Sequence, residues 1–128
     1  MSLQITFRHM QPSDSVEVAI RKRASELERF HPRIVGCHVV FEQGHRHQNK
    51  GRLFHVRIDL KVPGGTLCVG HEQQDAHAHE DAYVAIRDSF DAMRRQLEDF
   101  VRRQDGRVKK HFSSVNLLRE RVVAKAAS

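Results

Sequence analysis

Three segments of the chain alternate apolar and polar residues at every second position, the period of a half-buried β-strand. They lie at about residues 3–7, 34–42 and 54–62. Pro63-Gly64-Gly65 follows the third segment and has turn chemistry, so residues 66–70 are predicted to return as its antiparallel partner. The alternate apolar positions are Leu3, Ile5, Phe7, Cys37, Val39, Phe41, Phe54, Val56, Ile58, Leu60 and Val62.

Two other segments carry apolar residues at steps of three and four, the period of an amphipathic helix. The first follows a cap at Ser13 or Asp14 and ends before Pro32, because the residue before proline disfavours helix. The second and longer one runs from Asp81 to about Gln104, where Asp105-Gly106 is expected to stop it. The predicted buried stripes are Val16, Ile20, Ala24 and Leu27 in the first, and Ala82, Tyr83, Ile86, Phe90, Met93, Leu97 and Val101 in the second.

The elements therefore follow the order β-α-β-β-β-α, with polar loops at residues 44–51 and 71–79. A right-handed crossover makes the first two strands parallel neighbours, and each strand offers one apolar face for both helices. The sequence predicts an α+β fold: a two-layer sandwich of a four-stranded mixed sheet with two helices on one face. Residues 1–104 are expected to form one domain, and 105–128 a flexible basic tail.

The 128-residue chain has a formal net charge of +6, which favours an acidic partner such as nucleic acid. The charge is uneven: residues 1–104 hold sixteen Lys and Arg against fourteen Asp and Glu, and residues 105–128 hold six against two. RNA binding by the folded part must therefore depend on where its charges lie.

Arginine outnumbers lysine on both predicted helices, and a planar guanidinium suits phosphates and stacked bases. Most of these arginines also lie four residues from an acid, so a solvated surface of ion pairs explains them equally well. The candidate RNA-binding residues on the helices and on the uncovered sheet face are Arg8, Lys22, Arg23, Arg29, Arg57, Lys61, Arg87, Arg94, Arg95, Arg102 and Arg103.

Catalysis and metal binding have little support. The sequence has no glycine-rich phosphate loop, nucleophile elbow or His-Glu-x-x-His motif, so we expect neither an enzyme nor a small-molecule substrate or cofactor. The histidine pairs at residues 45–47 and 77–79 lack the paired thiolates of a structural zinc site, so no metal is expected. Cys37 and Cys68 are predicted to face opposite sides of the sheet as free thiols. No apolar run is long enough to cross a membrane, which favours the cytoplasm.

The residues also resemble the ribosome hibernation-promoting factor and ribosome-associated inhibitor family in its short form. The likeness spans about residues 3–104. Its motifs are Asp81-x-Tyr83-x-Ala85-Ile86, Gln96-Leu97, Arg8-His9, Arg23 with Leu27-Glu28-Arg29, and Pro63-x-Gly65-x-Leu67. The family's fold is a β-α-β-β-β-α sandwich similar to a double-stranded-RNA-binding domain.

This resemblance implies a monomeric stress protein that binds rRNA of the small ribosomal subunit and sterically blocks messenger and transfer RNA. It adds His9 to the candidate RNA-binding residues, and it places Arg23, Arg29 and Arg95 at basic positions of the family. The chain departs from the family's usual basic residues at Glu26, Ala92 and Asp99, and adds arginines at 87 and 94.

Two further hypotheses remain open. The same fold could serve as a general RNA-binding module or RNA chaperone that is not specific to ribosomes, or the uncovered sheet face could bind a protein partner.

Overall fold

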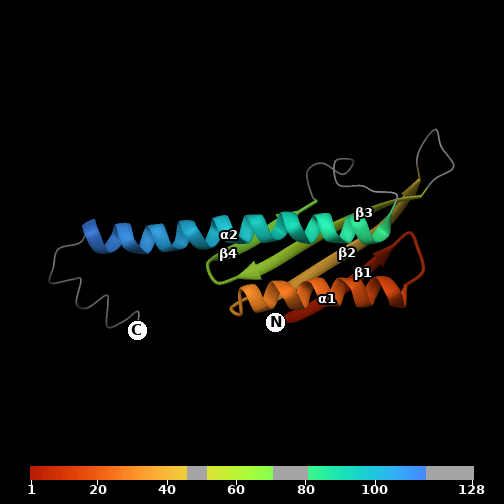
Figure 1. Cartoon of the computed structure of the whole chain (residues 1–128), viewed down its shortest axis with the longest axis horizontal. Coiled ribbons are helices and arrows are strands. Elements are labelled where there is room, and N and C mark those ends of the chain that lie inside the picture. Colours follow the sequence, from red (N-terminus) through yellow and green to blue (C-terminus); the bar gives the residue numbers. More distant parts are fainter. Residues whose placement is uncertain (46–51, 71–80, 115–128) are drawn as a thin grey trace. The chain divides into compact units, whose positions relative to one another are not determined.

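The computed structural model describes residues 1–45, 52–70 and 81–114 (Figure 1). The chain divides into two compact units, Met1–Arg95 and Gln96–Ser128. The order of elements is the predicted one: β1 (Ser2–Arg8), α1 (Asp14–Phe30), β2 (Gly36–His45), β3 (Arg52–Val62), β4 (Gly65–Val69) and α2 (Ala82–Ser114).

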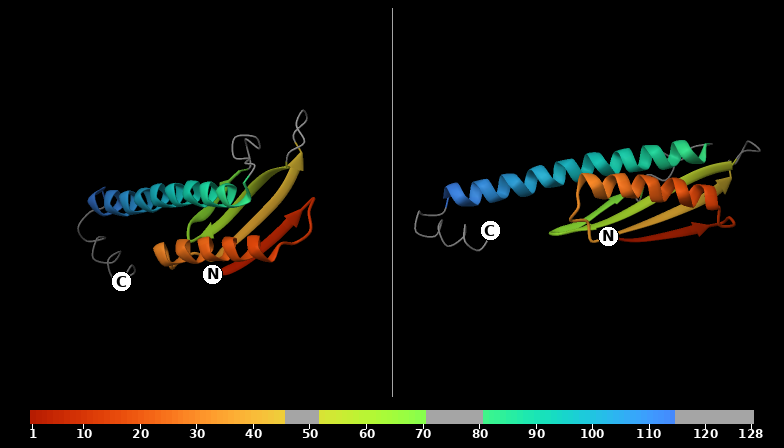
Figure 2. Two further views of the ribbon diagram at one scale, coloured as in Figure 1. Left: turned by 45° about the vertical axis from the view of Figure 1, so that its right-hand side comes forward. Right: turned by 60° about the horizontal axis from the view of Figure 1, so that its bottom comes forward.

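The sheet has the strand order β1-β2-β3-β4, with β1 parallel to β2 and the other neighbours antiparallel. The register aligns Ile5, Val39, Ile58 and Val69 across the four strands, so one row of apolar side chains crosses the whole sheet. α1 and the part of α2 that belongs to the first unit cover this apolar face, as Figure 2 shows. The predicted two-layer α+β sandwich is therefore confirmed.

The core lies between the helix layer and this face of the sheet. It forms because the apolar residues recur about every 2 residues in the strands and about every 3.6 residues in the helices. Each spacing places the apolar side chains of an element on one side, and these sides face the same interior. The most deeply buried large side chains are Phe41, Ile20, Ile58, Leu60, Ile86 and Met93.

The starts of both helices are fixed by side-chain caps. The Ser13 hydroxyl accepts a hydrogen bond from the backbone N–H of Val16 (3.4 Å), so Ser13 rather than Asp14 caps α1. A carboxylate oxygen of Asp81 accepts from the N–H groups of Tyr83 (2.8 Å) and Val84 (3.2 Å) at the start of α2. These caps fix the residues at which the two helices begin, and most candidate residues project from these helices.

The structure corrects two predictions about α2. The helix does not stop at Asp105-Gly106 but continues to Ser114. An interior glycine costs a helix only about 1 kcal/mol relative to alanine, and Gly106 keeps the helical conformation rather than a left-handed one. Tyr83 is 52% exposed and does not belong to the buried stripe, which instead passes through Ala85 and Ser89.

Candidate nucleic-acid interface

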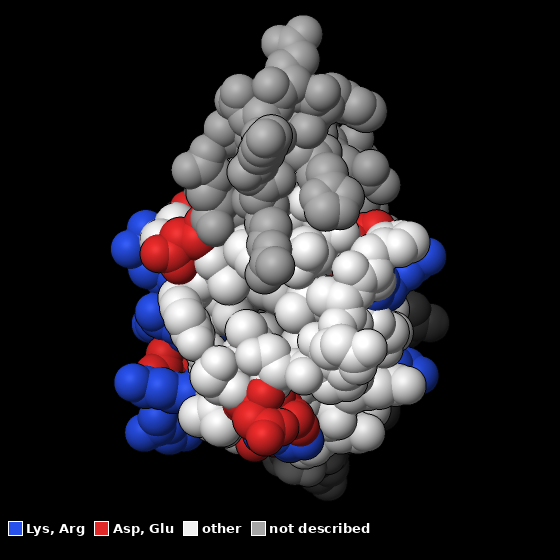
Figure 3. Space-filling view, turned by 90° about the vertical axis from the view of Figure 1, so that its right-hand side faces the viewer, with Lys and Arg blue, Asp and Glu red and all other residues white. Residues whose placement is uncertain are grey.

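The helix layer carries basic residues of α1 and α2 on the positions that the core does not use. Figure 3 shows Lys and Arg side chains gathered along its left margin, the side of the two helices, with Asp and Glu between them; a smaller group lies along the right margin. The candidate residues among them in α1 and the first part of α2 are Lys22, Arg23, Arg29, Arg87, Arg94 and Arg95, all exposed except the half-buried Arg23. We call these six residues the helix-layer cluster.

Acidic neighbours moderate the charge of this surface. Arg23 Nη1 lies 3.7 Å from Glu26 Oε2, and Arg87 Nε lies 3.2 Å from Asp88 Oδ1. Glu17 and Arg21, four residues apart on α1, form an ion pair with 2.8 Å between Glu17 Oε1 and Arg21 Nη2. Exposed pairs of this kind contribute between about 0 and 1 kcal/mol, so the arginines can exchange these partners for phosphates at little cost.

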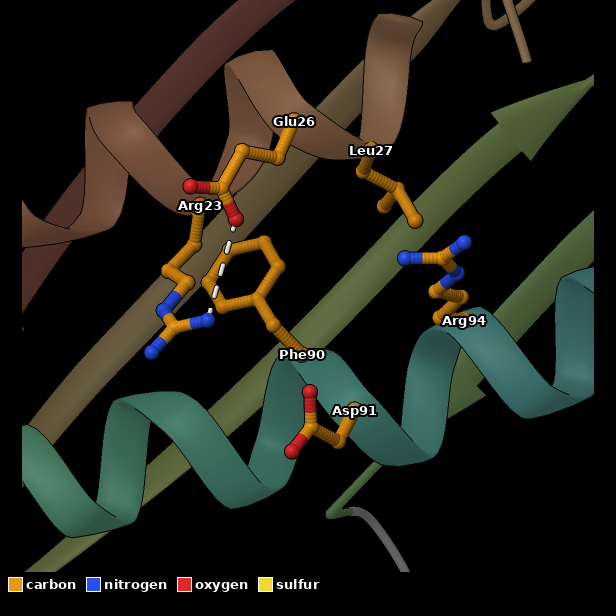
Figure 4. A pocket seen from close by; sticks show the side chains of 6 residues that line it. All are labelled: Arg23, Glu26, Leu27, Phe90, Asp91 and Arg94. Carbon is orange, nitrogen blue, oxygen red and sulfur yellow. Dashed lines mark ion pairs between the residues drawn. The ribbon is translucent and has the colours of Figure 1, made fainter. Parts of the chain in front are cut away.

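A hollow of about 60 Å³ opens between α1 and α2 within the helix layer. Leu27 and Phe90, both buried, form its apolar part. Figure 4 shows the Phe90 ring projecting from α2 towards α1, with Arg23 and Glu26 at one side of it and Arg94 close to Leu27. The residues that line the hollow are Arg23, Glu26, Leu27, Phe90, Asp91 and Arg94, and we refer to it as the interhelical hollow.

Beside the hollow, the Phe30 ring contacts the guanidinium group of Arg94. The guanidinium carbon of Arg94 lies 4.7 Å from the centre of the Phe30 ring, a cation–π contact between the two helices. The sequence presents Phe30 only as the end of α1. Its role could not be read from spacing along one helix, because its partner lies 64 residues away in the chain.

The other candidate residues of the first unit lie on the opposite face of the sheet. Arg57 and Lys61 alternate with the buried Ile58 and Leu60 along β3, so they point away from the helices. Arg8 has the same facing on β1, opposite Glu42 in the register. The structure therefore brings Arg23 and Arg94 to one hollow but places Arg8, Arg57 and Lys61 on a different face.

His9 follows the last residue of β1 and has a left-handed backbone (φ 59°), which turns the chain towards α1. Its Nε2 lies 3.3 Å from a carboxylate oxygen of Glu42. Arg102 and Arg103 belong to the second unit, where both are exposed and Arg102 is 2.6 Å from Asp99.

The two cysteines are free thiols on opposite sides of the sheet, as predicted, with Cys37 buried and Cys68 exposed. Burial, and secondarily the charge of Asp59, raises the pKa of Cys37 to about 12. Burial also raises the pKa of Cys68, as do a hydrogen bond to Asp59 and the Asp59 charge, while Arg57 lowers it. Both pKa values disfavour the reactive thiolate at neutral pH.

Within residues 1–45, 52–70 and 81–114, no group of three His, Cys, Asp or Glu side chains is arranged to hold a metal ion. The side chains of the two histidine pairs singled out in the sequence, at residues 45–47 and 77–79, lie outside the described part. No helix of the described residues is long and apolar enough to span a membrane.

Comparison with known proteins gives a consistent result. Residues 3–105 match the family described as Sigma 54 modulation protein / S30EA ribosomal protein. A ribosome hibernation promotion factor from Deinococcus radiodurans is 28% identical over 109 residues, which cover 81% of this chain and 53% of that protein. The chain thus spans about half the length of this curated relative.

Two solved structures share the fold. A ribosomal subunit interface protein from Coxiella burnetii superposes with a TM-score of 0.60 at 19% identity, covering 78% of this chain and 97% of that one. The N-terminal domain of Protein Y from Thermus thermophilus gives a TM-score of 0.56 at 19% identity, with 78% and 99% covered.

Proposed function

Because the chain belongs to the Sigma 54 modulation protein / S30EA ribosomal protein family, we propose that it is a ribosome-associated hibernation factor acting in the cytoplasm. In this proposal it binds rRNA of the small subunit near the decoding region and sterically excludes messenger and transfer RNA. The observation that carries the proposal is the family match over residues 3–105, which covers the sheet, α1 and most of α2. The family is non-enzymatic, and the proposed action needs no chemical step.

The sandwich suits steric blocking because its two layers share one packed core, which resists deformation when it fills a site. The helix-layer cluster supplies the contacts: guanidinium groups of Arg23, Arg29 and Arg95 donate charge-assisted hydrogen bonds to rRNA phosphates. Acidic neighbours such as Glu26 and Asp88 reduce non-specific attraction to other nucleic acid. Residues 1–104 form the binding domain in this proposal, and residues 105–128 add positive charge.

A general RNA-binding module is the second candidate. It is favoured by the division of the basic residues between two faces of the sandwich, since Arg8, Arg57 and Lys61 face away from the helices. Two basic faces suit loose contact with many RNAs, whereas a single blocking site needs one.

Cell-free translation titrated with the full chain and with residues 1–104 tests the proposal. Both forms should inhibit protein synthesis at saturation, because the sandwich is the blocking element. The shorter form should need a higher concentration and show a weaker dependence on salt, because it lacks a tail with six basic and two acidic residues. A short form that occupies ribosomes fully but does not inhibit would assign the block to the tail instead.

A further inference from the structure

The interhelical hollow has a composition that phosphate binding does not explain. It places two guanidinium groups, Arg23 and Arg94, beside two carboxylates, Glu26 and Asp91, over the apolar surface of Leu27 and Phe90. Its formal charge is therefore zero. A phosphate inside the hollow would lie near both carboxylates, and their repulsion would offset much of the attraction of the arginines.

A nucleobase fits this set of groups better than an anion does. Its edge presents hydrogen-bond acceptors and donors side by side, and its ring has an apolar face. Arginine donates to base acceptors, carboxylates accept from exocyclic amino groups, and apolar or aromatic side chains contact the ring. At about 60 Å³ the hollow is too small for a whole nucleotide, so only one edge of a base would enter it.

We propose that the interhelical hollow binds the Watson–Crick edge of an unpaired guanine in RNA. Guanine is the base whose edge presents two adjacent donors, N1–H and the N2 amino group, next to the acceptor O6. Glu26 or Asp91 accepts from the two donors, and Arg94 donates to O6, while Arg23 keeps the phosphate contact proposed above. The inference rests on the proposed RNA-binding function and adds a base preference to it.

The geometry around Arg94 supports a fixed rather than a mobile donor. Its guanidinium lies over the Phe30 ring at 4.7 Å, so one face of the group is already stacked between the two helices. Arg23 Nη1 lies 3.7 Å from Glu26 Oε2, an ion pair drawn in Figure 4 that is too weak to fix either side chain. A donor held in place loses less side-chain entropy when it binds a base.

The test measures fluorescence anisotropy of labelled oligouridine at about 50 mM salt, with and without a single central guanosine, and with inosine in its place. A base contact of this kind is worth about 1–3 kcal/mol. Because the hollow is open to solvent, we expect the contact to contribute an energy at the lower end of this range. A factor of ten in Kd corresponds to about 1.4 kcal/mol, so the guanosine oligonucleotide should bind 5- to 10-fold more tightly than oligouridine. Inosine lacks the N2 amino group and should bind with intermediate affinity.

Two variants distinguish the guanine pocket from simple electrostatic attraction between the protein and RNA. Glu26→Gln and Asp91→Asn each remove a negative charge, so simple electrostatics predicts tighter binding of every oligonucleotide. The guanine pocket instead predicts that in at least one of the two variants the preference for guanosine falls towards one, while oligouridine binding stays equal or strengthens. Glu17→Gln is the matched control, because Glu17 lies on the same helix, pairs with Arg21 and does not line the hollow.

The outcomes separate this inference from the proposed function. Loss of the preference in at least one of the Glu26 and Asp91 variants but not in the control, with unchanged thermal unfolding, supports the guanine pocket; a preference kept in both overturns it. A wild-type protein that binds oligouridine and ribosomes without preferring guanosine overturns the pocket and leaves the proposed function intact. A protein that binds neither RNA nor ribosomes overturns both the guanine pocket and the proposed function.

Discussion

Reversing two charges of the helix-layer cluster tests which face of the sandwich meets rRNA. The double variant Arg23→Glu and Arg95→Glu changes one residue on each helix, neither of which contributes to the buried core. Both side chains of the Arg23–Glu26 pair that it disrupts are partly exposed (37% and 40%), so the fold should lose less than about 1 kcal/mol. The matched control is Arg8→Glu with Lys61→Glu, two exposed residues of the opposite sheet face.

The expected magnitude follows from simple electrostatics. An arginine about 4 Å from a phosphate gains about 1 kcal/mol in water, and a glutamate at the same place loses a similar amount. Two reversals, allowing for screening by salt, should weaken small-subunit binding by about 2–4 kcal/mol, or roughly 30- to 700-fold in Kd. The slope of log K against log salt should become shallower by about 1.4–1.8, the share of two phosphate contacts.

The assay is a binding titration of labelled protein with vacant small subunits at several salt concentrations, and circular dichroism of each variant checks the fold. The control pair should lose much less affinity. Equal losses from both pairs would refute the assignment to the helix layer and favour diffuse electrostatic binding by a general RNA-binding module.

Two further predictions concern the fold and its thiols. Ser89 is fully buried in α2, and within the described residues its hydroxyl has no hydrogen-bond partner. Ser89→Ala should therefore raise the free energy of unfolding, measured in urea, by about 1 kcal/mol. A lower free energy of unfolding would mean that the hydroxyl does have a hydrogen-bond partner. In a thiol titration at about pH 8, Cys68 should react more slowly than free cysteine and Cys37 only after denaturation, because both pKa values are raised. Asp59→Asn should speed the reaction of Cys68, and immediate reaction of both thiols in the native protein would contradict this burial pattern.

The order and pairing of the elements could be predicted because each element carries its own signal. The alternation in β3 and the Pro63-Gly64 turn specify a hairpin locally, and the parallel β1-β2 pair follows from the handedness of crossovers. The end of α2 could not be predicted in this way. Gly106 stops a helix only when it adopts a left-handed conformation, and the residue type alone does not decide which conformation it takes.

The basic residues were also recognisable from the sequence, but their grouping was not. Spacing along one helix identifies Arg23 and Arg94 separately, whereas the interhelical hollow exists only once α1 and α2 pack side by side. Glu26 stood out in the sequence as a departure from the family's basic residues. In the structure it lies 3.7 Å from Arg23 and lines the hollow. Polar partners from distant segments depend on tertiary packing, which a local pattern does not encode.

Sedimentation tests the central claim, ribosome association, most directly. The purified protein is mixed with an excess of vacant small subunits and run through a sucrose gradient at about 50 mM salt and again at about 200 mM. The account predicts that the protein travels with the subunits at the lower salt and is progressively released at the higher. Protein that stays at the top of the gradient at the lower salt would contradict it.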